Sequence, residues 1–115
     1  MKVIIAGGRE FSPNNDSIAW VLKIINELHP DEIISGCARG ADTFGEKLAE
    51  HLNIPVRKFP ANWKFYGKAA GPIRNEQMAN YADACILFPG DRGTDDMRRR
   101  AKEHGLVLYE YTGVE

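Results

Sequence analysis

Residues 32–44 read EIISGCARGADTF and join a short β-branched run to the start of a helical pattern. Ile33 and Ile34 are typical of a buried strand, and apolar side chains recur at helical spacing from Asp42 onward. The loop between them contains two glycines with Arg39 in between. A tight turn needs only one glycine, so the second glycine and the arginine indicate a further role for this loop. The segment predicts a strand, a functional loop and a helix.

The same alternation of strand and helix runs along the chain. Apolar runs predict strands at residues 2–6, 32–35, 54–59, 84–88 and 106–111. Apolar periodicity and end signals predict helices at 16–28, 42–52, 72–81 and 94–104, with Thr94 as an N-cap, Asn53 as a C-cap and Pro72 in a first turn. Strands that alternate with helices imply a parallel sheet covered on both faces. We therefore predict a three-layer α/β Rossmann-like domain with a mostly parallel five-stranded sheet and about four helices.

Length and composition are those of one small globular domain spanning residues 1–115. The net charge of −1 argues against a generally basic nucleic-acid-binding surface. Two cysteines give no sign of a disulfide framework, which indicates a reducing compartment. The apolar run in MKVIIAGGRE is too short for a signal or a membrane span, so we expect a cytoplasmic protein with no membrane partner. The three histidines, at the predicted C-terminal ends of helices, suggest no metal site.

The four strand-to-helix loops are predicted to meet at the carboxyl edge of the sheet, where ligands of such folds bind. They are residues 7–15, 36–41, 60–71 and 89–93. Glycine-rich loops before helix N-termini present free N–H groups and a positive dipole end to an anion. The chain has no P-loop and no G-x-G-x-x-G, so ordinary dehydrogenase chemistry is not expected and no cofactor is assigned. The structural alternative for Gly36 and Gly40 is a tight turn at the start of a helix.

Four motifs together resemble one known family. They are GGREF (7–11), SGCARGAD (35–42), FPANWKFYGKAAGPIRNEQM (59–78) and GTDDM (93–97). In this order they resemble the YspA-type, cpYpsA-related branch of the SLOG superfamily, whose wider relatives include the LOG enzymes and DprA. The resemblance implies a Rossmann-like fold that binds nucleotides or nucleotide-derived ligands, and a homo-oligomer, dimeric or larger.

The resemblance and the loop chemistry together nominate a set of ligand-binding residues. The family motifs supply Gly7, Gly8, Arg9, Ser35, Gly36, Gly40, Ala41, Asp42, Arg74, Asn75, Gly93 and Thr94, and the loops add Arg39, Trp63, Pro89 and Gly90. LOG enzymes carry a catalytic glutamate three residues after the threonine of their P-G-G-x-G-T-x-x-E motif, and this chain has Met97 there. Methionine cannot transfer a proton, so LOG-type phosphoribohydrolase chemistry is doubtful and no catalytic residue is assigned.

Several of these side chains have a structural alternative. Arg9, Arg74 and Arg92 can clamp phosphate or pair with nearby carboxylates, and Asp42 can hold ribose hydroxyls or cap its own helix. Trp63, Phe65 and Tyr66 can stack on a base, or pack their loop down as a lid or subunit contact. Asp95 and Asp96 can act as acid and base or complement a helix dipole, and Arg98–Arg100 are expected on a solvated face.

Three functions remain open from the sequence. The first is a binding module that senses or sequesters a nucleotide-derived small molecule such as an NAD-like, ADP-ribose-like or nucleoside phosphate ligand. The second is a hydrolase that cleaves an N-glycosidic or phosphoester bond in such a ligand with a carboxylate at position 10, 42, 76, 95 or 96. The third, less favoured, is single-stranded DNA binding as in DprA.

Overall fold

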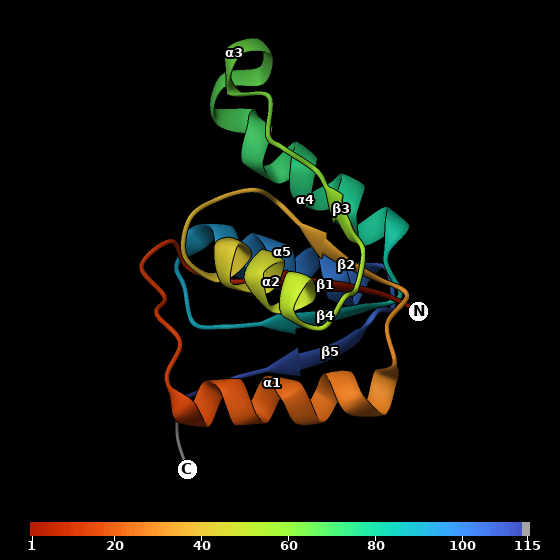
Figure 1. The fold of residues 1–115 in the computed structure, drawn as a ribbon. Helices are drawn as coiled ribbons and strands as arrows, with labels where there is room; N and C mark the ends of the chain where they lie inside the picture. The colour runs from red at the N-terminus through yellow and green to blue at the C-terminus, as the bar shows by residue number, and fades with distance from the viewer. Residues whose placement is uncertain (114–115) are drawn as a thin grey trace.

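The computed structural model describes residues 1–113 and contains a five-stranded sheet between two layers of helices (Figure 1). The predicted domain also includes residues 114 and 115, which lie outside the described part. The strands are β1 (Lys2–Ala6), β2 (Glu32–Ser35), β3 (Val56–Lys58), β4 (Ala84–Leu87) and β5 (Val107–Glu110). The helices are α1 (Asn15–Leu28), α2 (Ala41–His51), α3 (Trp63–Tyr66), the 3₁₀ turn η1 (Gly67–Ala69), α4 (Ala70–Tyr81) and α5 (Arg92–Glu103).

The sheet order is β3-β2-β1-β4-β5, and every neighbouring pair is parallel. The α/β Rossmann-like prediction is therefore confirmed, with a sheet that is fully rather than mostly parallel. The chain moves outward from β1 through β2 to β3, then returns to the other side of β1 to form β4. The loops after β1 and β4 lead to helices on opposite faces of the sheet at this reversal, which is the usual ligand position in such sheets.

Alternation along the strands explains the two layers. On β1, Val3 and Ile5 pack into the core shared with α1 and α2, whereas Ile4 and Ala6 pack into the core shared with α4 and α5. All four residues are buried, as expected for a parallel strand covered on both faces. Because β1 is packed on both faces, it positions the start of the loop that follows it.

Element boundaries differ from the sequence predictions by one or two residues at every predicted helix start and in three strands, because the predicted strands 54–59, 84–88 and 106–111 are shorter in the structure. Thr94 is not an N-cap, because α5 begins at Arg92 after the N-cap Asp91. The C-cap of α2 is Leu52 rather than Asn53, which follows it with φ 57°. Pro72 is the third residue of α4, because α3 and η1 lead directly into that helix.

The sequence prediction missed α3. Asn62 caps it by accepting a hydrogen bond from the amide of Phe65 at 3.1 Å. Its aromatic side chains are exposed, so no amphipathic pattern marked the helix. Figure 1 shows α3 at the tip of a projection that extends, together with the start of α4, beyond the rest of the fold.

No helix within residues 1–113 combines the length and the apolar character needed to cross a bilayer.

Candidate functional site

A cavity of about 500 Å³ lies at the carboxyl ends of β1 and β4. The β1 loop contributes Gly7, Gly8 and Arg9, and the first turn of α5 contributes Gly93 and Thr94. Helix α4 and the segment before it complete the wall with Trp63, Lys68, Gly71, Pro72, Arg74, Asn75 and Met78. The cavity therefore occupies the switch point that the topology singles out.

The loops after β1 and β4 touch through their backbones. The amide of Gly8 donates to the carbonyl oxygen of Pro89 at 2.9 Å. A Cβ atom on Gly90 would lie 2.0 Å from Thr94 Oγ1 and 2.6 Å from the Gly8 nitrogen. Only glycine fits at position 90 without displacing this contact, so the two loops form one rigid edge of the cavity.

The loop after β2 uses much of its polar capacity internally. Ser35 Oγ donates to Glu46 Oε2 at 2.6 Å and accepts from the Cys37 amide at 3.1 Å. Asp42 Oδ2 accepts from the Ala38 amide at 3.1 Å. The amides of Cys37 and Ala38 are thus already occupied by side chains of the same segment.

Gly40, not Asp42, is the N-cap of α2, and no side chain caps this helix. Gly40 has φ 78°, and a Cβ atom there would lie 2.3 Å from the Gly8 carbonyl oxygen. The Ala41 amide donates to the same oxygen at 3.2 Å. Gly40 and Ala41 therefore join the second loop to the first.

Arg74 crosses the cavity wall without a carboxylate partner. Its Nη1 donates to the carbonyl oxygen of Gly36, and its Nε donates to Asn75 Oδ1 at 3.0 Å. Burial lowers the pKa of the Arg74 guanidinium, with Asp42 acting in the opposite direction. The expected alternative, a pair with Glu76, is not formed.

Arg9 lies at the mouth of the cavity, with its guanidinium carbon 5.7 Å from the centre of the Trp63 ring. Among the described residues, neither Arg9 nor Arg74 has a carboxylate within ion-pair distance. Two cations thus line the cavity without a direct ion pair among the described residues, although Asp42 lies near enough to interact with both.

Asp42 is a buried carboxyl group that also lines this cavity. Burial raises its pKa to about 6, although the hydrogen bond from Ala38 and the charge of Arg74 act to lower it. A carboxyl with such a pKa exchanges protons near neutral pH, which is the behaviour required of an acid or base in catalysis.

The first turn of α5 has no side-chain cap. Its N-cap Asp91 makes no side-chain hydrogen bond to the helix. Thr94 Oγ1 is buried and has no hydrogen-bond partner within residues 1–113. A buried hydroxyl without a partner costs about 1–3 kcal/mol. A ligand oxygen at this helix end could accept hydrogen bonds from the hydroxyl and from the amides of the first turn.

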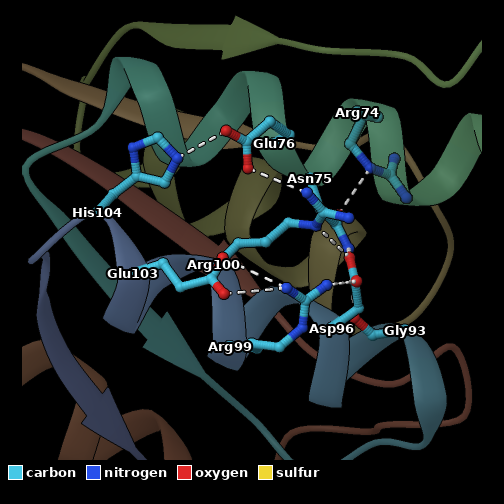
Figure 2. A network of polar contacts seen from close by, with 9 residues as sticks. All are labelled: Arg74, Asn75, Glu76, Gly93, Asp96, Arg99, Arg100, Glu103 and His104. Carbon is cyan, nitrogen blue, oxygen red and sulfur yellow. Dashed lines mark hydrogen bonds and ion pairs between the residues drawn. The ribbon is translucent and has the colours of Figure 1, made fainter.

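A polar network joins α4 to α5 behind this turn (Figure 2). Asn75 Nδ2 donates to Asp96 Oδ2 at 3.0 Å and to the Gly93 carbonyl oxygen at 3.3 Å. Asp96 pairs with Arg100 at 2.9 Å, and Arg100 pairs with Glu76 at 3.0 Å. The network fixes the first turn of α5 relative to Arg74, so Asn75 both lines the cavity and positions its neighbours.

The same contacts decide the role of the charged residues on α5. Asp95 pairs with Arg98, and Asp96 pairs with Arg99 and Arg100. Burial acts to raise the pKa of Asp96, but hydrogen bonds from Arg100 and Asn75 outweigh burial and lower this pKa below its ordinary value. The solvated-face prediction is wrong for Arg100, whose side chain is only 19% exposed.

Comparison with known proteins agrees with the motifs and the fold. A model of the YspA, cpYpsA-related SLOG family matches residues 1–66, which is more than half of the chain. The chain belongs to this SLOG family. Gene 61 protein of Mycobacterium phage D29 is 30% identical over 122 residues, covering 96% of this chain and 95% of that protein. No solved structure matches significantly. SLOG membership suggests a nucleotide-related ligand.

The structure gathers most of the predicted SLOG site residues around two adjoining cavities. Nine line the 500 Å³ cavity: Gly7, Gly8, Arg9, Asp42, Trp63, Arg74, Asn75, Gly93 and Thr94. Gly36 and Arg39 line a neighbouring cavity of about 410 Å³. The remaining predictions, Ser35, Gly40, Ala41, Pro89 and Gly90, line neither cavity and support the loops through the contacts described above.

Other residues that line the main cavity were not among the predicted site residues. They include Lys68, Met78, Asp91 and Met97. Met97 is 1% exposed and lies on the cavity wall, in the position of the LOG glutamate. Met78 and Met97 belong to the apolar core formed with α4 and α5, and an apolar side chain in a helix gives no sign of a ligand.

Proposed function

We propose that this SLOG domain binds a nucleotide or nucleotide-derived small molecule at the carboxyl edge of its sheet and acts as a sensor or sequestering module. A phosphate group of the ligand lies at the first turn of α5. The observation that carries the proposal is Thr94 Oγ1, a buried hydroxyl without a partner at an uncapped helix N-terminus that lines the cavity.

Charge around the cavity supports an anionic ligand. Arg74 is partly buried and lacks a carboxylate partner, which costs desolvation energy that a phosphate would offset. Lys68 and Arg92 also line the cavity. Trp63, which is 49% exposed and adjoins Arg9, offers an aromatic face for a base.

We expect binding without LOG-type turnover because of the residue that replaces the LOG glutamate. Met97 supplies no carboxylate, and the neighbouring Asp96 is held by Arg99, Arg100 and Asn75. Positions 96 and 97 therefore supply no free carboxylate in place of the LOG glutamate.

The test is a thermal-shift panel with AMP, ADP, NAD, ADP-ribose, cyclic dinucleotides and a short DNA strand, followed by HPLC of each mixture. A ligand at one hundred times its Kd stabilises the fold by about 2.7 kcal/mol, or roughly 10 °C or more for a small domain. We expect a shift with a nucleotide that is recovered intact. No shift with any nucleotide would contradict the proposal.

The variant Thr94→Val tests the role of the hydroxyl. Valine has nearly the same shape, so the variant removes an unsatisfied buried group and leaves the apo fold as stable as before or more stable. We expect nucleotide affinity to fall about tenfold, the value of one lost hydrogen bond to a charged group. Unchanged affinity would place the phosphate elsewhere.

A hydrolase is the second candidate, and the observation that favours it is Asp42. Of the five carboxylates considered from the sequence, Glu10, Glu76, Asp95 and Asp96 are held in ion pairs, whereas Asp42 faces the cavity without one. Asp42→Asn would then abolish turnover while binding persists. A product peak that survives this substitution would exclude Asp42 as the catalytic group.

The exposed aromatic side chains of α3 favour a third role in binding single strands or a second copy of the chain. Phe65 is 76% exposed, and Trp63 and Tyr66 are 49% and 42% exposed. Single-strand binding would combine base stacking on these rings with phosphate contacts to cations, and the phosphate contacts would make the DNA affinity strongly salt-dependent. A subunit contact would instead give a dimer that Phe65→Ala dissociates in light scattering.

A further inference from the structure

A second cavity of about 410 Å³ adjoins the main one. Both cavities are lined by Arg9, Ala38, Trp63 and Arg74, so they are two chambers of one cleft. The second chamber is completed by residues 36–39 after β2 and by Pro60 and Ala61 after β3. It therefore extends from the switch point toward the β3 edge of the sheet.

The two chambers differ in charge. Asp42, Asp91 and Asp96 line the main cavity together with its basic residues. The second chamber is lined by Arg9, Arg39 and Arg74, and no aspartate or glutamate of the described chain lines it. By its lining residues the second chamber is thus the more basic of the two.

These arginines are available to a ligand. Arg9 is exposed and lies over the Trp63 ring, while Arg74 donates from Nη1 to Gly36 and from Nε to Asn75. Arg39 pairs with Glu10 at 2.6 Å, but both side chains are largely exposed, at 69% and 87%. Such surface pairs contribute about 0–1 kcal/mol, so a phosphate can displace Glu10 at little cost.

We propose that the second chamber holds a second phosphate, so that the ligand is a nucleoside diphosphate or an ester of one rather than a nucleoside monophosphate. Arg9 and Arg74 belong to both chambers, and a diphosphate places its two phosphates close enough to contact the same guanidinium groups. Arg39 contacts only the second phosphate, because it lines only the second chamber. This inference rests on the proposed function, since the first phosphate remains at the first turn of α5.

The experiment is isothermal titration calorimetry at 0.15 M salt with AMP against ADP and with inorganic phosphate against pyrophosphate. The proteins compared are wild type, Arg39→Gln, Arg39→Lys and the control Arg57→Gln. Arg57 is an exposed cation on β3 that lies over the Tyr81 ring and lines neither chamber, so it reports the effect of net charge alone.

We expect ADP to bind about tenfold more tightly than AMP, the value of one charge-assisted hydrogen bond to the added phosphate. Arg39→Gln should remove that advantage and change AMP affinity less than about twofold, while Arg39→Lys should restore part of it. Pyrophosphate and phosphate should differ in the same direction. Arg57→Gln should leave both affinities within about twofold of wild type.

Two results would overturn the inference and spare the proposed function. One is AMP binding with no gain for ADP, and the other is an equal loss of AMP and ADP affinity in Arg39→Gln. Absence of binding by both AMP and ADP would overturn the inference and the proposed function together.

Discussion

Helices α1 and α5 start at the same edge of the sheet, after β1 and β4, but their first turns are built in opposite ways. In α1, Asn14 is the N-cap and Ser17 lies three residues later, and the two side chains satisfy each other's backbone amides at 2.9 Å. In α5, Asp91 is the N-cap and Thr94 lies three residues later, yet neither side chain makes the corresponding bond.

Two hydroxyl side chains at equivalent helix positions thus differ in their hydrogen bonding. Ser17 and Thr94 are both buried, but only Ser17 has hydrogen-bond partners. The α1 end is closed by its own capping box and is purely structural. The α5 end keeps its amides and hydroxyl free at a local cost, which is typical of a site that an external group completes.

The largest effect is expected where the loops touch. Gly40→Ala would force φ 78° on a residue with a side chain and place a Cβ atom 2.3 Å from the Gly8 carbonyl oxygen. We expect a loss of about 3 kcal/mol or more in urea unfolding, together with loss of nucleotide binding. The matched control is Gly105→Ala, which has φ 71° but no atom within 4 Å of a Cβ.

Gly105→Ala should cost only the backbone term, about 1–2 kcal/mol, and leave binding intact. Equal losses in the two variants would show that backbone angle alone decides both positions. The close contact between the loops after β1 and β2 would then contribute nothing measurable to the free energy of unfolding.

The buried carboxyl of Asp42 makes the open end of the molecule sensitive to pH. Its folded-state pKa of about 6 lies above the ordinary value of 3.8, so the folded state holds the proton more tightly than the unfolded state. The resulting destabilisation is absent below about pH 4 and complete above about pH 6, and stability falls as pH rises between them.

Asp42→Asn removes this dependence. Between pH 4.5 and 7.5 its stability relative to wild type should rise by about 2 kcal/mol, since two pKa units correspond to about 2.7 kcal/mol and part is already lost at pH 4.5. Urea unfolding at both pH values measures this difference. A constant difference between the two proteins would mean that Asp42 titrates normally.

A smaller effect is expected at the closed end. Asn14→Ala removes the capping box of α1 and should lower the free energy of unfolding by about 1 kcal/mol. Nucleotide affinity should not change, because Asn14 does not line either cavity. Together with Thr94→Val, which is expected to weaken binding without loss of stability, this variant separates the two ends. Weakened nucleotide binding in Asn14→Ala would contradict the conclusion that the α1 end is purely structural.

The smallest effect on stability is expected at the tip of α3. Phe65 is 76% exposed and its ring packs against Tyr66 at the surface, so Phe65→Ala should change the free energy of unfolding by less than about 0.5 kcal/mol. Binding of AMP should persist because Phe65 lines neither cavity. A larger loss in thermal denaturation would indicate that the ring is covered in solution by a second copy.

Local pattern was enough to predict the architecture. Continuous apolar runs placed β1 and β2 residue for residue at Lys2–Ala6 and Glu32–Ser35, because buried parallel strands select β-branched residues on both faces. The alternation of strands and helices then determined that four loops share one edge of the sheet. The loop chemistry and the family motifs nominated eleven of the residues that line the two chambers, together with five that line neither.

Only the tertiary structure decided how the charges and hydroxyls are used. Arg74 donates to Gly36 across 38 positions of sequence instead of pairing with nearby Glu76, and Arg100 takes Glu76 from another helix. Thr94 looks like a helix cap in sequence, but it lies inside the first turn of α5 against Gly90. Local propensity depends on near neighbours, whereas ion pairs, hydrogen-bond partners and burial depend on which distant segments the fold brings into contact.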